Sequence, residues 1–177
     1  MPERSRVAES RGIRKYGDKV LRGKNEKVKD FGPELAPLFD KMHETMIEAR
    51  GVGLAAPQVG VAKQIAIMNP EPENEKKLIK MVNPRIIVSS DETERIEEGC
   101  LSVPGIRGEV VRATRITVAY QDENGKARTL EAEGLLARIV QHELDHLNGV
   151  LFVDRLSFAK RALIKGKLKE LAGGKEK

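Results

Sequence analysis

The chain has 177 residues, of which 40% are hydrophobic and 33% are charged, and its formal net charge is +5. This size and composition are typical of one folded domain that buries roughly 70% of its unfolded surface, which argues against a disordered protein. The longest uncharged stretch, residues 51–62, is far shorter than the ~20 apolar residues of a membrane-spanning helix, so we expect no membrane partner.

Cysteine usage and the first residues indicate the compartment. Cys100 is the only cysteine, so an intramolecular disulfide is impossible and we expect a reducing environment. Residues 1–10 contain arginine but no apolar run after it, which argues against a secretory signal. We therefore expect a cytoplasmic protein, or an organelle form from which a transit peptide has been removed.

The positive charge is concentrated near the C-terminus. Residues 157–177 contain seven basic and two acidic residues, so this segment carries a net charge of +5 and the other 156 residues are neutral overall. An aromatic content of 3% and the absence of tryptophan leave few side chains on which bases could stack. We therefore expect neither single-stranded nucleic acid nor DNA as the main ligand.

The first predicted element is an amphipathic helix within residues 33–50. Its apolar residues recur at spacings of three and four, namely Leu35, Leu38, Phe39, Met42 and Met46. A connection rich in small residues follows at 51–60, and a strand is predicted at 64–68.

Four further strands are predicted at 78–82, 85–89, 115–120 and 128–133. Asn83 and Pro84 interrupt the apolar pattern between the first two of these strands. Residues 122–125 tolerate positive φ angles and predict a turn that joins the last two strands into a hairpin.

Two helices complete the predicted elements. From Gly134 the apolar spacing becomes helical, and Gly149 is placed to end this helix. A second helix is predicted from the N-cap residue Ser157 to Gly173 and Gly174. The order of elements predicts an α+β fold, in which antiparallel strands pack around a central helix flanked by an N-terminal and a C-terminal basic helix.

The last helix has two different faces. An apolar stripe that can dock on the domain is formed by Ile164, Leu168 and Leu171. The adjoining face is basic, with Arg161, Lys165 and Lys169 at intervals of four residues.

The central helix carries the residues best suited to chemistry. His142 and His146 are four residues apart, so they share one face of the helix and can bind one metal ion. Glu143 lies beside this pair, where a carboxylate can act as a general base. A solvated helix that carries two histidines is the alternative, but the apolar flanking residues predict burial, where unpaired imidazoles are unfavourable.

A catalytic site with two histidines needs a third protein ligand. The downstream candidates are Asp154, which follows too closely, and Glu170 and Glu176, which lie in the charged tail. Upstream, Cys100 is the only thiol, and nearby glycines would let its backbone approach a metal. A buried inert thiol is the alternative. Next to two histidines that lack a partner, the metal-ligand interpretation is favoured.

Three segments occur in a characteristic order: GVGLAAPQ at 51–58, EGCLS at 98–102 and QHELDHL at 141–147. Together they resemble the three signature motifs of the peptide deformylases, and the resemblance extends from about residue 13 to residue 156. It implies a metal-dependent hydrolase that removes the formyl group from the N-terminal formyl-methionine of newly synthesised polypeptides and releases formate. It also implies a catalytic domain at residues 1–156, with residues 157–177 as a basic helical tail of the same domain.

The resemblance further implies a role for individual residues. Glu143 would move protons, while the Gln58 side-chain amide and the Leu101 backbone N–H would donate hydrogen bonds to the oxyanion of the tetrahedral intermediate. The slot for the methionine side chain would be lined by Val52, Leu135, Ile139 and the ring of His142. For Leu135 and Ile139, ordinary core packing is the alternative. Gly53 would pair with the substrate main chain, and Arg107 would reach over the peptide.

The expected cofactor is one divalent metal ion per chain, held by Cys100, His142 and His146. A thiolate ligand suits Fe²⁺ as well as Zn²⁺, and relatives also work with Ni²⁺ or Co²⁺, so Fe²⁺ is the expected native metal. The expected partners are formyl-methionyl nascent peptides and, through the basic tail, ribosomal RNA. Two alternatives stay open, an HExxH-type metallopeptidase and a catalytically silent module that binds RNA or ribosomes.

Overall fold

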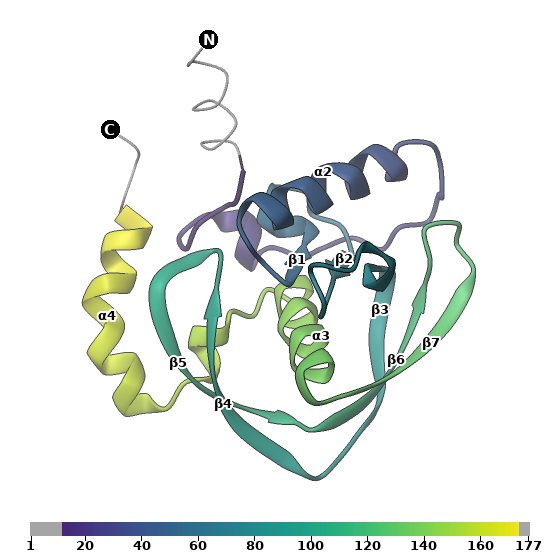
Figure 1. Ribbon diagram of the computed structural model, residues 1–177. Helices are drawn as coiled ribbons and strands as arrows, with labels where there is room; N and C mark the ends of the chain where they lie inside the picture. The colour runs from purple at the N-terminus through teal and green to yellow at the C-terminus, as the bar shows by residue number, and fades with distance from the viewer. Residues whose placement is uncertain (1–11, 174–177) are drawn as a thin grey trace.

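The computed structural model describes residues 12–173 (Figure 1). Residues 1–11 of the predicted catalytic domain lie outside this range, as do Gly174, Lys175, Glu176 and Lys177 of the predicted tail. The helices are α2 (Leu35–Glu48), α3 (Gly134–Leu147) and α4 (Phe158–Gly173). The strands are β1 (Gly53–Ala55), β2 (Ile65–Met68), β3 (Ile79–Ser89), β4 (Thr93–Cys100), β5 (Val103–Ala113), β6 (Arg115–Gln121) and β7 (Ala127–Glu133).

Two antiparallel sheets surround α3. One sheet has the strand order β1-β2-β3-β6-β7, and the other consists of β4 and β5. In Figure 1, α3 lies at the centre of the molecule, α2 lies beyond β1 and β2, and α4 lies beside β5. The predicted α+β fold with antiparallel strands around a central helix is therefore confirmed.

Strand β2 shows how the core is divided between two helices. Ile65 and Ile67 pack in the cluster that includes the buried face of α2, whereas Ala66 and Met68 pack in the cluster that includes α3. All four residues are fully buried. Since side chains alternate across a strand, both faces of β2 need apolar residues, which explains its uninterrupted apolar sequence.

The break predicted at Asn83 and Pro84 is wrong, because β3 is one strand whose pairing shifts register between Val82 and Arg85. Asn83 has a φ of 51°, and its side-chain Nδ2 donates a hydrogen bond of 2.8 Å to Oε1 of Gln121. Pro84 follows within this irregularity, where a missing backbone N–H is tolerated. The two residues form a bulge and do not end the strand.

The sequence analysis missed β1, β4 and β5. The sequence of β4 is TERIEEGC, and its glutamates are unfavourable in strands. The strand is stable here because Glu98 is buried with Arg112 of β5, which forms two hydrogen bonds to it. A local pattern of charges does not reveal this partner, which is 14 residues away in the chain.

Both predicted C-terminal helices are confirmed. Helix α3 ends at Leu147, and Gly149 follows with a φ of 71°. In α4, the backbone N–H of Lys160 donates to Oγ of Ser157 at 3.2 Å, so Ser157 is the N-cap. The predicted stripe also docks, because Ile164 is buried in a cluster against which Leu168 and Leu171 pack. Among the described residues, no helix is long and apolar enough to cross a membrane.

Candidate active site and metal centre

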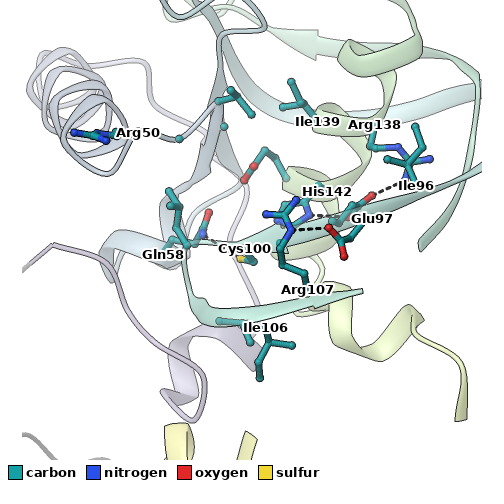
Figure 2. A pocket seen from close by; sticks show the side chains of 18 of the residues that line it. Arg50, Gln58, Ile96, Glu97, Cys100, Ile106, Arg107, Arg138, Ile139 and His142 are labelled. Atoms are coloured by element: carbon teal, nitrogen blue, oxygen red, sulfur yellow. Dashed lines mark hydrogen bonds and ion pairs between the residues drawn. The ribbon is translucent and has the colours of Figure 1, made fainter. Parts of the chain in front are cut away.

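A cleft of about 600 Å³ opens beside the N-terminal half of α3 and is bounded by β1 and the β4–β5 hairpin. Figure 2 shows Gln58, Cys100 and His142 directed toward one another in this cleft. The predicted site residues that line the cleft are Val52, Gly53, Gln58, Cys100, Leu101, Arg107, Leu135, Ile139, His142 and Glu143. The remaining one, His146, is buried behind His142 on the next helical turn.

Cys100, His142 and His146 form a metal-binding group. One ligand atom from each residue can be chosen so that all three atoms lie within 4.8 Å of one another. Sγ of Cys100 is 3.2 Å from Nε2 of His146. A thiolate with two imidazoles is a donor set that suits Zn²⁺ and Fe²⁺, so these residues fit the metal that the sequence predicts.

The other predicted ligand candidates do not join this group. Asp154 accepts a hydrogen bond of 3.0 Å from Nη2 of Arg22 and a further bond from Nη1. Glu170 lies exposed on α4, and Glu176 lies outside the described residues. The upstream cysteine is therefore the third residue that the fold brings to the histidine pair.

Glu98 orients the first histidine. Its Oε2 lies 3.0 Å from Nδ1 of His142, which leaves Nε2 of the ring for a metal. Burial opposes the charge of Glu98, but hydrogen bonds from Arg112 and His142 hold the pKa of this carboxyl well below its usual range. Burial likewise lowers the pKa of His142, yet hydrogen bonds with Cys100 and Glu98 outweigh it and raise the pKa to about 10 in the metal-free protein.

A buried network of charges extends from Glu98 to the far side of α3. Arg112 donates to Glu98 at 2.6 Å and to Asp145 at 2.9 Å, and Arg138 donates to Glu98 at 2.7 Å. Asp145 also accepts two hydrogen bonds from Arg155. Sequence analysis did not identify these positioning residues, because they come from separate elements and carry no shared spacing.

Glu143 is set apart from this network. It is 4% exposed, and among the described residues its Oε2 has no hydrogen-bond partner. Burial raises the pKa of Glu143 to about 7. Gly53 lies directly against this carboxyl, which a Cβ at residue 53 would displace. Glu143 thus lines the cleft with a carboxyl group whose Oε2 is buried and unpaired among the described residues.

The Gln58 amide is held in one orientation. The backbone N–H of Ala55 donates to Oε1 of Gln58 at 2.8 Å, and Nε2 of Gln58 donates to Oγ of Ser102 at 3.1 Å. Nε2 also lies 3.8 Å from Sγ of Cys100. Because an amide nitrogen carries two hydrogens, one donor is committed to Ser102 and the other is directed to the region of the thiol.

The rim of the cleft combines apolar and charged residues. Leu135 is 60% exposed, which weighs against core packing, whereas Ile139 is only 5% exposed. Arg107 is not free in the structure, because its Nε donates to Glu97 at 2.9 Å. Figure 2 shows Arg107 and Glu97 joined by this bond. Sequence analysis missed the lining residues Ile96 and Glu97, which lie on the unpredicted strand β4.

A sequence model described as polypeptide deformylase matches residues 10–162. This chain belongs to the polypeptide deformylase family. A peptide deformylase of Thermodesulfovibrio yellowstonii is 46% identical over 158 residues, which cover 89% of this chain and 95% of that protein. A peptide deformylase of Brachyspira hyodysenteriae is 45% identical over 160 residues, which cover 88% of this chain and 86% of that protein.

Solved structures of deformylases share the fold. A peptide deformylase of Plasmodium falciparum superposes with a TM-score of 0.87 at 38% identity, covering 93% of this chain and 99% of that one. A Legionella pneumophila peptide deformylase gives a TM-score of 0.85 at 44% identity, covering 90% of this chain and 94% of that one.

The family match gives the class of reaction. Members of this family are metal-dependent hydrolases that remove the formyl group from N-terminal formyl-methionine, and this chain has the Cys/His/His group for the metal. The match decides against the HExxH-type metallopeptidase and against a catalytically silent module.

Proposed function

We propose that this chain deformylates nascent peptides with Glu143 as its proton carrier and Gln58 and Leu101 as its oxyanion donors. The observation that carries this proposal is buried Glu143, which lines the cleft next to His142 of the metal-binding group and whose Oε2 has no hydrogen-bond partner among the described residues. The family reaction needs a base at this position, and the fold supplies one whose pKa is raised to about 7 by burial.

The metal would be held by Cys100, His142 and His146. A bound divalent ion supplies a Lewis acid that lowers the pKa of water toward neutrality. We propose Fe²⁺ as the native ion, since one thiolate and two imidazoles suit it, with Zn²⁺, Ni²⁺ and Co²⁺ as ions that can replace it. Glu98 supports the assignment of His142 as a ligand, because its hydrogen bond fixes the orientation of the His142 ring.

Glu143 acts twice in the proposed reaction. It takes a proton from the attacking water as the oxygen bonds to the formyl carbon, and it returns that proton to the amide nitrogen as the C–N bond breaks. The products are formate and a peptide with a free amino terminus. A carboxyl whose pKa is near 7 is suited to both steps, because it gains and loses a proton at little cost.

The oxyanion would form between Gln58 and Leu101. The amide orientation set by Ala55 and Ser102 directs the second N–H of Gln58 toward Sγ of Cys100, and this N–H would turn from the sulfur to the oxyanion. Leu101 follows Cys100 directly, so a metal on the thiolate also fixes the backbone N–H of Leu101. Donors that are fixed before the reaction stabilise the developing charge without reorganisation.

The rest of the cleft would hold the peptide. Val52, Leu135 and Ile139 supply apolar surface for the methionine side chain, and Gly53 can pair with the peptide main chain as with an added strand. A cavity at the reacting carbon that accepts a hydrogen but no methyl group would favour formyl over acetyl. For Arg107 to reach the peptide, it must exchange its bond to Glu97 for one to the substrate.

Metal analysis of anaerobically purified protein, combined with formate release from formyl-Met-Ala, tests the proposal. We expect about one metal ion per chain, iron in excess over zinc, and no turnover of acetyl-Met-Ala. Cys100→Ala should lose both metal and turnover, whereas His43→Ala on α2 should keep both. Full metal content in Cys100→Ala would overturn the ligand assignment, and a wild-type protein that releases no formate would overturn the function.

We further propose that α4 holds the enzyme near the ribosome in the cytoplasm. Its apolar stripe is packed on the domain, while Arg161, Lys165 and Lys169 are exposed. Ribosomal RNA is densely anionic, so a basic helix surface raises the local concentration of enzyme where formylated chains emerge.

A further inference from the structure

A short segment near the N-terminus connects the two proposed oxyanion donors. This segment, Arg14–Tyr16, is called the strap below. The backbone N–H of Arg14 donates to the carbonyl of Gln58 at 2.7 Å. The backbone N–H of Tyr16 donates to the carbonyl of Ser102 at 2.8 Å, and Nζ of Lys15 donates to the carbonyl of Leu101 at 2.9 Å. Three consecutive residues therefore contact the Gln58 segment and the Leu101 segment together.

Lys15 and Tyr16 of the strap bind the tight turn between β4 and β5. Cys100 pairs with Val103, so Leu101 and Ser102 are the two residues that join β4 to β5. Their carbonyls lie outside the ladder of the hairpin, and the strap provides a donor for each. Leu101 thus has a potential metal ligand on its N-terminal side and a strap-bound peptide group on its C-terminal side. The direction of its backbone N–H depends on both of these constraints.

Of the three strap contacts with the Gln58 and Leu101 segments, only that of Lys15 uses a side chain. The contacts of Arg14 and Tyr16 use backbone N–H groups, which nearly every substitution would keep. The ammonium group of Lys15 is a charged donor, and charged donors form shorter and stronger hydrogen bonds to carbonyls than neutral ones. Partial burial lowers the pKa of Lys15, and the nearby Cys100 offsets part of this shift.

The strap is itself anchored. Tyr16 packs against the cluster that contains Leu21 and Ile164, and a Cβ on Gly17 would lie 2.6 Å from Cα of Ala172 in α4. Directly after Gly17, Asp18 caps the short helix Lys19–Arg22 by accepting a hydrogen bond from the backbone N–H of Val20 at 3.0 Å. A segment held in this way can fix the groups to which it bonds.

We propose that Lys15 is a positioning residue for the oxyanion hole. By holding the Leu101 carbonyl, its ammonium group orients the peptide chain through Leu101 so that the backbone N–H points at the reacting carbonyl, at a fixed distance from Gln58. This inference rests on the proposed function, which assigns the donor roles to Leu101 and Gln58.

The test compares Lys15→Met with Lys19→Met in the metal-loaded enzyme. Both substitutions remove one lysine charge from the same region, but among the described residues the Lys19 ammonium makes no hydrogen bond. We expect kcat for formyl-Met-Ala to fall about tenfold in Lys15→Met, less than the ~10²–10³ for removal of an oxyanion donor itself. KM and metal content should stay within about twofold, because the contact acts on the transition state and not on substrate binding.

Two further measurements separate positioning from general destabilisation. Lys15→Arg keeps a charged donor and should retain kcat within about twofold of wild type. In the zinc-loaded protein without substrate, the amide order parameter of Leu101 should fall in Lys15→Met from the ~0.85 of rigid backbone toward ~0.6, and should not change in Lys19→Met.

An unchanged kcat in Lys15→Met, or an equal loss in Lys19→Met, would overturn the role of Lys15 in an active enzyme. An unchanged order parameter of Leu101 would overturn it as well. A wild-type protein that releases no formate would instead refute the proposed function itself, so the two failures are distinguishable.

Discussion

Helices α3 and α4 have similar lengths, 14 and 16 residues, and both carry several charged or titratable side chains, yet the fold uses them in opposite ways. In α3, Glu143, Asp145 and His146 are all buried. In α4, Ile164 is the only buried residue, and four of the basic residues are exposed, namely Arg161, Lys165, Lys167 and Lys169. The charged side chains of α3 therefore interact with groups or ligands inside the protein. The exposed charged side chains of α4 can instead interact with another molecule.

The largest difference between the two helices is expected in turnover, when a glutamate on each helix is replaced by glutamine. Glu143→Gln keeps the size of the side chain but removes the base, so we expect kcat for formate release to fall by ~10²–10⁴ with metal content unchanged. Glu170→Gln on α4 is the matched control and should leave kcat unchanged within about twofold. Near-normal turnover of Glu143→Gln at saturating substrate would show that the proton carrier is another group.

The second-largest difference is expected in the free energy of unfolding, between the loss of a buried charge beside α3 and the loss of an exposed charge on α4. Arg112→Leu removes the donor that Glu98 and Asp145 share, and it leaves two buried carboxylates short of a partner. We expect the free energy of unfolding to fall by about 3–5 kcal/mol, measured by urea denaturation of the zinc-loaded protein.

Lys165→Leu on α4 is the control for this change, because Lys165 is exposed and its removal should alter the free energy of unfolding by less than ~0.5 kcal/mol. Equal losses in the two variants would contradict the contrast between paired and solvated charges. A small loss in Arg112→Leu would mean that Arg138 and Arg155 compensate for the missing guanidinium.

Metal binding should depend on pH through His142. Its pKa is raised to about 10 in the metal-free protein, so between pH 6 and pH 8 the ring is protonated and must lose that proton to become a ligand. Affinity for Zn²⁺ should therefore rise by about tenfold per pH unit over this range. Competition with a chelator at several pH values measures it.

His43 provides the control for the pH experiment, because it lies on α2 outside the metal-binding group. His43→Gln should leave the slope unchanged. Affinity that does not vary between pH 6 and pH 8 would show that His142 is already neutral, and that its bond to Glu98 leaves the ring uncharged.

The contrast between the helices also explains what the sequence could predict. Helix α3 was identified because its apolar period, its two histidines and Gly149 are local signals. The third member of the metal group could be inferred since Cys100 is the only thiol. By contrast, the pairing of Glu98 with Arg112 depends on β4 and β5. The charged residues of these segments do not by themselves predict strands, because the partner of each charge lies on the other strand.

The contacts at the rim of the cleft were also hard to predict from the sequence, because they too depend on tertiary structure. Arg107 was predicted to reach over the peptide, but its hydrogen bond of 2.9 Å to Glu97 was not predicted, because the register of the hairpin decides which charges meet. The contact of Lys15 with Leu101 spans 86 positions along the chain and has no local signal at all. Local patterns thus predicted which groups react, and tertiary contacts determine what holds them in place.

The smallest effect on catalysis is expected from the surface of α4. The triple variant Arg161→Glu, Lys165→Glu and Lys169→Glu should release formate from formyl-Met-Ala within about twofold of the wild-type rate, since exposed charges contribute little to the fold. Its binding to ribosomes should nevertheless weaken and lose most of its salt dependence, because fewer counterions are released from RNA. Cosedimentation with ribosomes at several salt concentrations measures both.

A matched variant distinguishes the α4 surface from net charge. Reversal of Lys24, Lys27 and Lys29, which are exposed and precede α2, changes the net charge by the same amount. If both triple variants lose ribosome affinity equally, overall charge is sufficient and α4 is no specific contact. If only the α4 variant loses affinity while dipeptide turnover persists, the helix is a docking surface that is separate from catalysis. Loss of dipeptide turnover in the α4 variant would instead show that these side chains support the domain on which Ile164 packs.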